Sequence, residues 1–175
     1  MRPKLSSPRL WSDSTLKDAH KRWEAGESMR IIELSKEECK QLLKRVHIGR
    51  LACSQDDQPY VVPVCFSYES NSIYIFSAVG KKIQWMRLNP KVCLQADEIG
   101  GPKNWFSVIV TGTYLELGER QHTSQREHAL QRLSEYSEWW LVPLAQKRET
   151  ASDLSIEPVF FRIDIESMTG LGTVP

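Results

Sequence analysis

Apolar and polar side chains alternate along much of the chain from residue 48 onward, and this period of two predicts β-strands. The segments that follow the pattern are 48–54, 59–68, 72–77, 91–98, 106–117 and 158–166. Clusters of Asp, Asn, Ser and Gln between the first three segments supply the turns of hairpins. Short alternating strands joined by hairpins favour an antiparallel barrel. We therefore expect a mainly β fold, a split barrel of about six strands with flanking helices.

Two other segments carry the spacing of an amphipathic helix. The first opens with Ser35-Lys-Glu-Glu38, a capping box in which the two side chains satisfy each other's backbone N–H groups. Its apolar stripe comprises Cys39, Leu42, Leu43 and Val46. The second opens with the capping box Ser124–Glu127, and its apolar positions are Ala129, Leu130 and Leu133. We expect these helices, over 35–46 and 124–135, to cover part of the barrel.

The strand predicted over 59–68 contains a proline at its centre. One face of this strand is buried, because its even positions are Tyr60, Val62, Val64, Phe66 and Tyr68. Pro63 lies on the other face and cannot donate to a ladder, so the strand is expected at an edge or a split in the sheet. Pro63 either only protects this edge from aggregation or leaves room for a planar ligand. The residues alone leave both readings open.

A small-residue turn with two lysines follows the strand 72–77. Ala78–Gly80 is succeeded by Lys81, Lys82 and a short helical pattern that stops at Asn89-Pro90. Glycine permits close backbone approach, the helix start offers N–H groups, and the lysines add positive charge, so this turn can seat one phosphate. A solvated loop has the same composition. The turn lacks the glycine spacing and the Ser or Thr of a P-loop.

The composition of the chain gives no sign of a nucleic-acid-binding, membrane or metal-binding protein. The 175 residues carry a formal net charge of +1, which gives no reason to expect a nucleic-acid partner. No apolar run is long enough to span a membrane, and we expect no membrane association. Four cysteines without a CxxC pair and four histidines without ligand spacing predict no metal site. The cysteines are expected to be free thiols in a reducing cytoplasm.

The first 28 residues differ from the rest of the chain. They are polar and contain two prolines, and their acidic residues argue against a transit peptide. We expect a flexible N-terminal tail over 1–28 and one domain over 29–175.

Several short motifs, in this order and spacing, resemble the split-barrel flavoproteins related to pyridoxamine phosphate oxidase. They are Ile48-Gly-Arg-Leu-Ala52, Pro59–Val64, Ile73–Ser77 with Gly80-Lys-Lys82, Asn89–Val92, Trp105–Val108 with Gly112, and Val159–Ile163. The most similar branch comprises flavin-nucleotide-binding proteins that include nitroimidazole-resistance proteins. The resemblance covers about residues 29–170, and it implies an FMN-binding homodimer with the flavins at the subunit interface.

The resemblance also implies site residues. Ser77, Gly80, Lys81 and Lys82 would hold the phosphate, Lys82 being the lysine that matches the family motif. The strand around Val62, Pro63 and Val64 would line the flavin ring. Arg50 either lies near the phosphate or is an ordinary solvent-facing or paired arginine. The segment from Trp105 to Ser107 either approaches a flavin, its own or that of the partner subunit, or belongs to the core. The strand that follows, Phe106–Val110, is apolar on both faces, and a dimer partner would cover the outer one.

The expected function is that of a flavin-dependent oxidoreductase with NAD(P)H or another transient donor, because the cofactor supplies the redox chemistry. The alternatives are a non-catalytic module that binds a flavin or haem, and an interaction protein with an empty barrel. Nitroimidazole-resistance proteins commonly carry a histidine where this chain has Phe76. The resemblance implies that Phe76 belongs to the cofactor-binding residues, but Phe76 cannot transfer a proton, so the catalytic residues stay unassigned.

Overall fold

A computed structural model describes residues 29–101, 103–118, 122–134 and 158–174. The predicted tail over 1–28 lies outside these ranges. The described residues form seven strands and three helices. In chain order they are β1 (Arg30–Glu33), α2 (Lys36–Arg45), β2 (Ile48–Gln55), β3 (Gln58–Glu69), β4 (Ser72–Ala78), α3 (Lys81–Leu88), β5 (Lys91–Gly101), β6 (Asn104–Glu116), α4 (Thr123–Ser134) and β7 (Pro158–Val174).

The strands form one antiparallel sheet that closes on itself. Their order is β1-β7-β4-β3-β2-β5-β6, and an additional pairing of β6 with β7 completes the ring. At Gly112 the two closing strands approach so tightly that a Cβ atom would lie 2.4 Å from the Asp164 carbonyl oxygen. The predicted mainly β fold with an antiparallel barrel is therefore confirmed.

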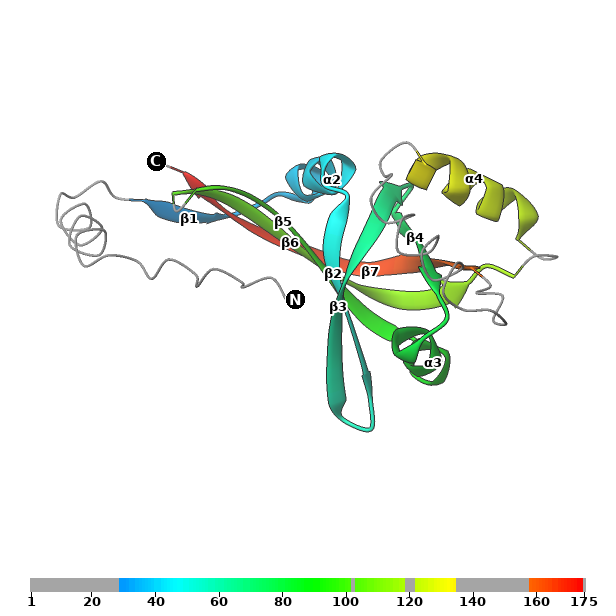
Figure 1. The fold of residues 1–175 in the computed structure, drawn as a ribbon. Coiled ribbons are helices and arrows are strands. Elements are labelled where there is room, and N and C mark those ends of the chain that lie inside the picture. The colour runs from blue at the N-terminus through cyan, green and yellow to red at the C-terminus, as the bar shows by residue number, and fades with distance from the viewer. Residues whose placement is uncertain (1–28, 102, 119–121, 135–157, 175) are drawn as a thin grey trace, which may run out of the picture.

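The long strands extend beyond the barrel into an arm. β5, β6 and the second half of β7 run out together, and β1 pairs with the end of β7 (Figure 1). Strand β1 was not predicted, because its four residues have no alternating burial and the strand with which it pairs, β7, lies about 140 residues away along the chain. Strand β7 runs past its predicted end for the same reason, since its second half pairs with β1 and β6, which are distant in sequence. Strand β5 extends to Gly101 through a local hairpin with the start of β6.

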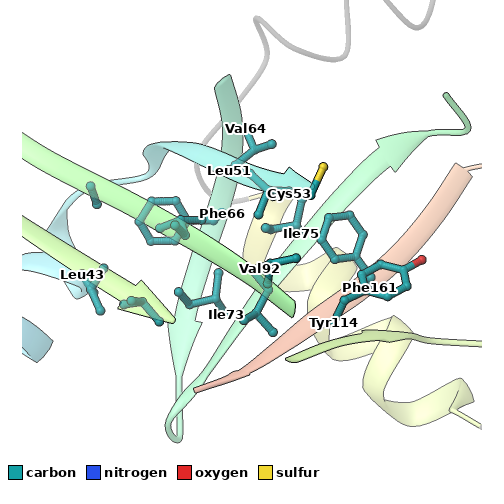
Figure 2. Close-up of a cluster of buried hydrophobic side chains, with 14 of the residues drawn as sticks. Leu43, Leu51, Cys53, Val64, Phe66, Ile73, Ile75, Val92, Tyr114 and Phe161 are labelled. Carbon is teal, nitrogen blue, oxygen red and sulfur yellow. The ribbon is translucent and has the colours of Figure 1, made fainter. Parts of the chain in front are cut away.

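The core fills the barrel with side chains from every strand around the ring. Figure 2 shows labelled core residues from β2 to β7 meeting in one cluster, which includes Leu51, Phe66, Ile75 and Phe161. Helix α2 adds Leu42 and Leu43, and helix α3 adds Ile83 and Met86, all fully buried. Burial of these apolar side chains is the main stabilising contribution to the fold.

The helices begin close to where the sequence predicts. In α2 the Ser35 N–H donates to the Glu38 carboxylate at 2.8 Å, and the Glu38 N–H donates to the Ser35 hydroxyl at 3.3 Å, which confirms the capping box. Helix α4 starts at Thr123, so Ser124 is the second helical residue and not its cap. The N–H of Arg126 already bonds the carbonyl of His122, which extends the helical pattern ahead of Ser124. Ala129 and Leu133 are buried as predicted, whereas Leu130 is 56% exposed.

Strand β3 contains the split that Pro63 predicts. β3 pairs with β2 over its first eight residues, Gln58–Cys65, and with β4 only over its last four residues, Phe66–Glu69. Residues 58–65 therefore leave their other edge without a β4 partner, and Pro63 lies in that part. The proline removes no ladder bond on this side of the strand.

In the part of the chain that the structure describes, no helix has the length and apolar character that crossing a membrane requires. The four cysteines are free, three of them buried. No metal-binding group of three or more His, Cys, Asp or Glu side chains occurs among the described residues.

Candidate functional site

The start of helix α3 is open at its N-terminus. Gly80 is the N-cap, and it has no side chain that could accept a hydrogen bond from the first turn. A Cβ atom built on Gly80 would meet nothing within 4 Å, so none of the described residues fills the space above the helix start. Uncapped N–H groups and the helix dipole together favour an anion at this position.

Lys81 places its ammonium group over two aromatic rings beside this helix start. Its Nζ atom lies 4.2 Å from the ring centroid of Trp85 and 4.8 Å from that of Tyr60. The two rings meet edge to face, with centroids 5.6 Å apart and planes at 63°. This cation–π contact holds a positive charge next to the open turn.

Lys82 contributes a second positive charge in the same region. Burial raises the pKa of the Cys53 thiol, and the charges of Lys82 and Lys81 act in the opposite direction. Both ammonium groups therefore lie close enough to the end of β2 to influence Cys53 electrostatically. This rim of the barrel, where β2 ends and α3 begins, is cationic.

Ser77 lies on the barrel side of β4, immediately before the turn. Its hydroxyl is buried and donates a hydrogen bond of 3.0 Å to the carbonyl of Ala78. The structure thus brings together four predicted phosphate-site residues at one strand-to-helix junction, and they are Ser77, Gly80, Lys81 and Lys82.

The predicted ring-lining residues of β3 divide between its two faces. Val62 and Val64 belong to or pack against the core cluster, whereas Pro63 is exposed on the outer face. The next outer residue toward the hairpin, Val61, is 57% exposed. Along this part of β3, Pro63 and Val61 are therefore the exposed side chains, whereas those of Val62 and Val64 are turned toward the core.

Arg50 lies on the same outer face, directly opposite Pro63 in the β2–β3 register. It forms an ion pair with Asp97 of β5. The sequence left open whether Arg50 is paired, and the structure shows that it is. Its side chain is still 48% exposed, so one edge of the guanidinium faces solvent.

Trp105 and Ser107 lie on β6, in the arm and away from the α3 turn. The backbone N–H of Trp105 donates to the Thr173 hydroxyl at 3.0 Å. The Ser107 hydroxyl accepts a 3.2 Å hydrogen bond from Gln95, and Ser107 lies opposite Asp97 in the register. These residues group with Arg50 on the outer face. One copy of the chain therefore presents two separate sets of predicted site residues.

Phe76 is not part of either set. Its ring packs against Phe160 at 5.0 Å, in a small cluster under α4 with Leu117 and Ala129. It lies on the face of β4 opposite to Ser77, as the alternation of burial along β4 shows.

A network around α3 was missed by the sequence analysis. Arg87 makes two hydrogen bonds with the Glu116 carboxylate, at 2.7 and 2.8 Å, and the Tyr114 hydroxyl donates to the same carboxylate at 2.7 Å. The bond from Arg87 lowers the pKa of Glu116, and burial raises the pKa of Tyr114. The period-two spacing of Tyr114 and Glu116 was the available signal, but nothing local connects them to Arg87.

Comparison with known proteins adds independent information. The family model described as pyridoxamine 5'-phosphate oxidase matches residues 35–171. An uncharacterized protein from Rhizobium meliloti (strain 1021) is 41% identical over 142 residues, which cover 78% of this chain and 91% of that protein.

Solved structures share the fold. A FAD-binding protein from Mesorhizobium loti is 41% identical, with a TM-score of 0.70 over 85% of this chain and 100% of that one. The FAD binding protein from Mycobacterium smegmatis is 22% identical, with a TM-score of 0.53 over 79% of this chain and 97% of that one. The second likeness supports the fold alone.

Proposed function

The chain belongs to the pyridoxamine 5'-phosphate oxidase family, and from this membership and the geometry at α3 we propose that it binds a flavin. The observation that carries the proposal is the junction of β4 and α3. There an uncapped helix start, an open Gly80 and two lysines meet within six residues of the buried Ser77. The M. loti protein, 41% identical, is described as FAD-binding, which supports the same ligand class.

In this proposal the flavin phosphate binds at the start of α3. The first-turn N–H groups and the Lys82 ammonium would hold it, with Lys81 adding charge from its place over Trp85. The bound flavin would supply the redox chemistry, which no described side chain of the site can provide. The protein's own task is to bind and orient the cofactor and to limit the access of water to it.

The second part of the proposal is a homodimer. The outer face of the barrel and arm exposes apolar side chains that one chain leaves in water. Those with at least 40% exposure on β2, β3, β5, β6 and β7 are Ile48, Val61, Ile99, Ile109 and Leu171. A second copy against this face would bury them, and it would bring its own Trp105–Ser107 segment toward the split at Pro63. This arrangement would unite the two separate sets of site residues.

FMN is the flavin that the sequence predicts, since the α3 turn can seat one phosphate. FAD is the second candidate, and the description of the M. loti relative favours it. Both ligands contain the same flavin mononucleotide half, so the proposed phosphate seat serves either one. Release of the cofactor by heat, followed by mass spectrometry, separates them: FMN is expected, and FAD would correct the identity of the cofactor without moving the site.

We also propose that the bound flavin acts as the redox centre of an oxidoreductase, with NAD(P)H as a transient donor. A non-catalytic flavin-binding or haem-binding module is the alternative, and the position of Phe76 favours it because that ring is packed against Phe160 and offers no proton. The free cysteines of the described residues support a reducing, cytoplasmic location.

One set of spectra tests the proposal. The purified protein is expected to be yellow, with flavin absorbance that bleaches when NADPH is added. Exposure to air should restore the absorbance, and the protein should then continue to consume NADPH. A flavin spectrum that NADPH and NADH leave unchanged would favour the binding module. A protein that binds neither FMN nor FAD after incubation with an excess of each would contradict the flavin assignment itself.

A further inference from the structure

Helix α3 is joined to the barrel by an ionic network at its C-terminal end. Arg87, in the last turn, faces Glu116 at the end of β6, and both oxygen atoms of the carboxylate accept hydrogen bonds from the guanidinium. This parallel two-bond geometry fixes direction as well as distance, because a guanidinium and a carboxylate can pair this way only when their planes align.

Tyr114 fixes the carboxylate from the other side. Its hydroxyl donates to Glu116, its side chain is only 7% exposed, and its ring lies 5.1 Å from that of Phe161 in the core. Its backbone N–H also bonds the Pro90 carbonyl, just beyond the helix, at 2.8 Å. Burial raises the pKa of the phenol, so it stays a donor, while Arg87 lowers the pKa of Glu116, so it stays an acceptor.

A second attachment lies one residue beyond the helix. The side-chain amide of Asn89 donates to the carbonyl and hydroxyl oxygens of Ser54 at the end of β2, at 3.0 and 3.2 Å. The helix is therefore tied to β6 and to β2 at its end, while its buried Ile83 and Met86 rest on the core. These apolar contacts hold the helix against the core, but they restrain its rotation and translation along the core only weakly, since they are not directional.

We propose that Arg87, Glu116 and Tyr114 are positioning residues that aim the start of α3 at the cofactor phosphate. The inference rests on the proposed function. Lys81 and Arg87 are separated by about 9 Å along the helix axis, at 1.5 Å per residue, so the network does not touch the phosphate. The network acts through the rigid helix, because a tilt of the helix axis at the C-terminal end of α3 displaces the N–H groups at its N-terminal end. Hydrogen bonds to an anion are sensitive to such misalignment.

The test separates phosphate alignment from general stability. Riboflavin has the flavin ring without the phosphate, so the ratio of FMN to riboflavin affinity reports the phosphate seat alone. For Glu116→Gln, which keeps the size but not the charge, FMN affinity is expected to fall about tenfold, the scale of one misaligned charge-assisted hydrogen bond. Riboflavin affinity is expected to stay unchanged. Arg87→Lys, which loses the two-bond geometry but keeps the charge, is expected to act in the same direction.

Glu69→Gln is the matched control. Glu69 pairs with Arg132 of α4 at 3.2 Å, and the exposures of this pair, 31% and 40%, are close to the 35% and 46% of Glu116 and Arg87. Removing this charge also breaks an ion pair between a helix and a strand, and it should leave the FMN to riboflavin ratio as in the wild type.

The outcomes are distinguishable. If the wild type binds FMN no more tightly than riboflavin, the proposed phosphate site at the start of α3 is wrong, and the positioning role of Arg87, Glu116 and Tyr114 is wrong as well. If the wild type prefers FMN and Glu116→Gln keeps the full preference, the seat stands and the positioning role is overturned. A proportional loss of both affinities would show a merely structural role and would also overturn it.

Discussion

The ammonium group of Lys81 lies 4.2 Å from the centre of the Trp85 ring, four residues further along the same helix. Neighbours at this spacing share one side of a helix, so the contact is set by α3 itself. Tyr60, from the beginning of β3, completes the arrangement at 4.8 Å. The Lys81 ammonium therefore lies over two aromatic rings, and it would have to leave them to approach a phosphate.

Lys82→Ala is expected to weaken FMN binding about ten- to a hundredfold, the range of one charge-assisted hydrogen bond. Lys81→Ala should weaken FMN binding less, because the Lys81 ammonium must leave the Trp85 and Tyr60 rings to approach a phosphate. Titration of apoprotein with FMN, followed by flavin fluorescence, measures both. Equal occupancy of wild type and Lys82→Ala at limiting FMN would remove Lys82 from the site, and a larger effect at Lys81 would reverse the assignment.

Gly80→Asp is expected to change stability and binding in opposite directions. Gly80 has extended backbone angles and open space around it, so a side chain fits, and an aspartate can cap the first turn of α3. The gain in stability is roughly a few tenths of a kcal/mol, because glycine is itself a tolerated N-cap residue. The same carboxylate would repel a phosphate and occupy its N–H donors. Gly80→Asn is the uncharged control: it should stabilise the protein similarly and weaken FMN binding less. A Gly80→Asp protein that retains wild-type FMN affinity would contradict the phosphate seat.

Acid is expected to weaken the attachment of α3. The pKa of Glu116 is lowered in the folded protein, chiefly by the hydrogen bonds from Arg87. For a carboxyl group with a depressed folded pKa, the stabilisation is complete above the unfolded value, about 4.3, and is lost as the pH falls through the folded pKa. Melting temperatures between about pH 3 and 7 should therefore converge for wild type and Glu116→Gln at the acid end. If the melting temperatures of wild type and Glu116→Gln differ by the same amount at every pH in this range, the Arg87–Glu116 pair adds no pH-dependent stability.

The outer face offers a test of the dimer. Ile109 is 46% exposed, whereas its neighbours Val108 and Val110 are fully buried, so a charge at Ile109 disturbs the surface and spares the core. Ile109→Asp is expected to produce a monomer with much reduced flavin occupancy. Leu130→Asp, at an exposed apolar position on α4, is the control and should stay dimeric. Mass in solution and bound flavin are measured together. A wild-type monomer would exclude the dimer, and a monomeric variant with full occupancy would break the proposed coupling.

Features that depend on residues close together in the chain were predicted correctly. The capping box of Ser35 and Glu38, the end of α3 at Asn89-Pro90 and the buried even face of β3 all follow from neighbours within a few residues. Pro63 also predicted the split correctly, since a missing donor restricts where a strand can lie.

The features that sequence reasoning missed depend on contacts between distant segments. Glu116 meets Arg87 across 29 residues, and β1 pairs with the far end of β7. The start of α4 moved by one residue because the turn before it already has helical hydrogen bonds. The predicted site residues were recognised from motifs, but their division between the α3 turn and the outer face required the register of the strands.

The last strand of the barrel has consequences for how the protein is made. Residues 158–174 pair with β1, β4 and β6, so the ring cannot close while the ribosome is still synthesising the earlier strands. Until then β4 and β6 each carry an unpaired edge, the kind of surface through which nascent chains aggregate. Closure over so long a stretch of chain is also entropically costly and slow. Truncation within β7 should therefore yield insoluble protein, and chaperones that shield strand edges should matter most in the interval before β7 emerges.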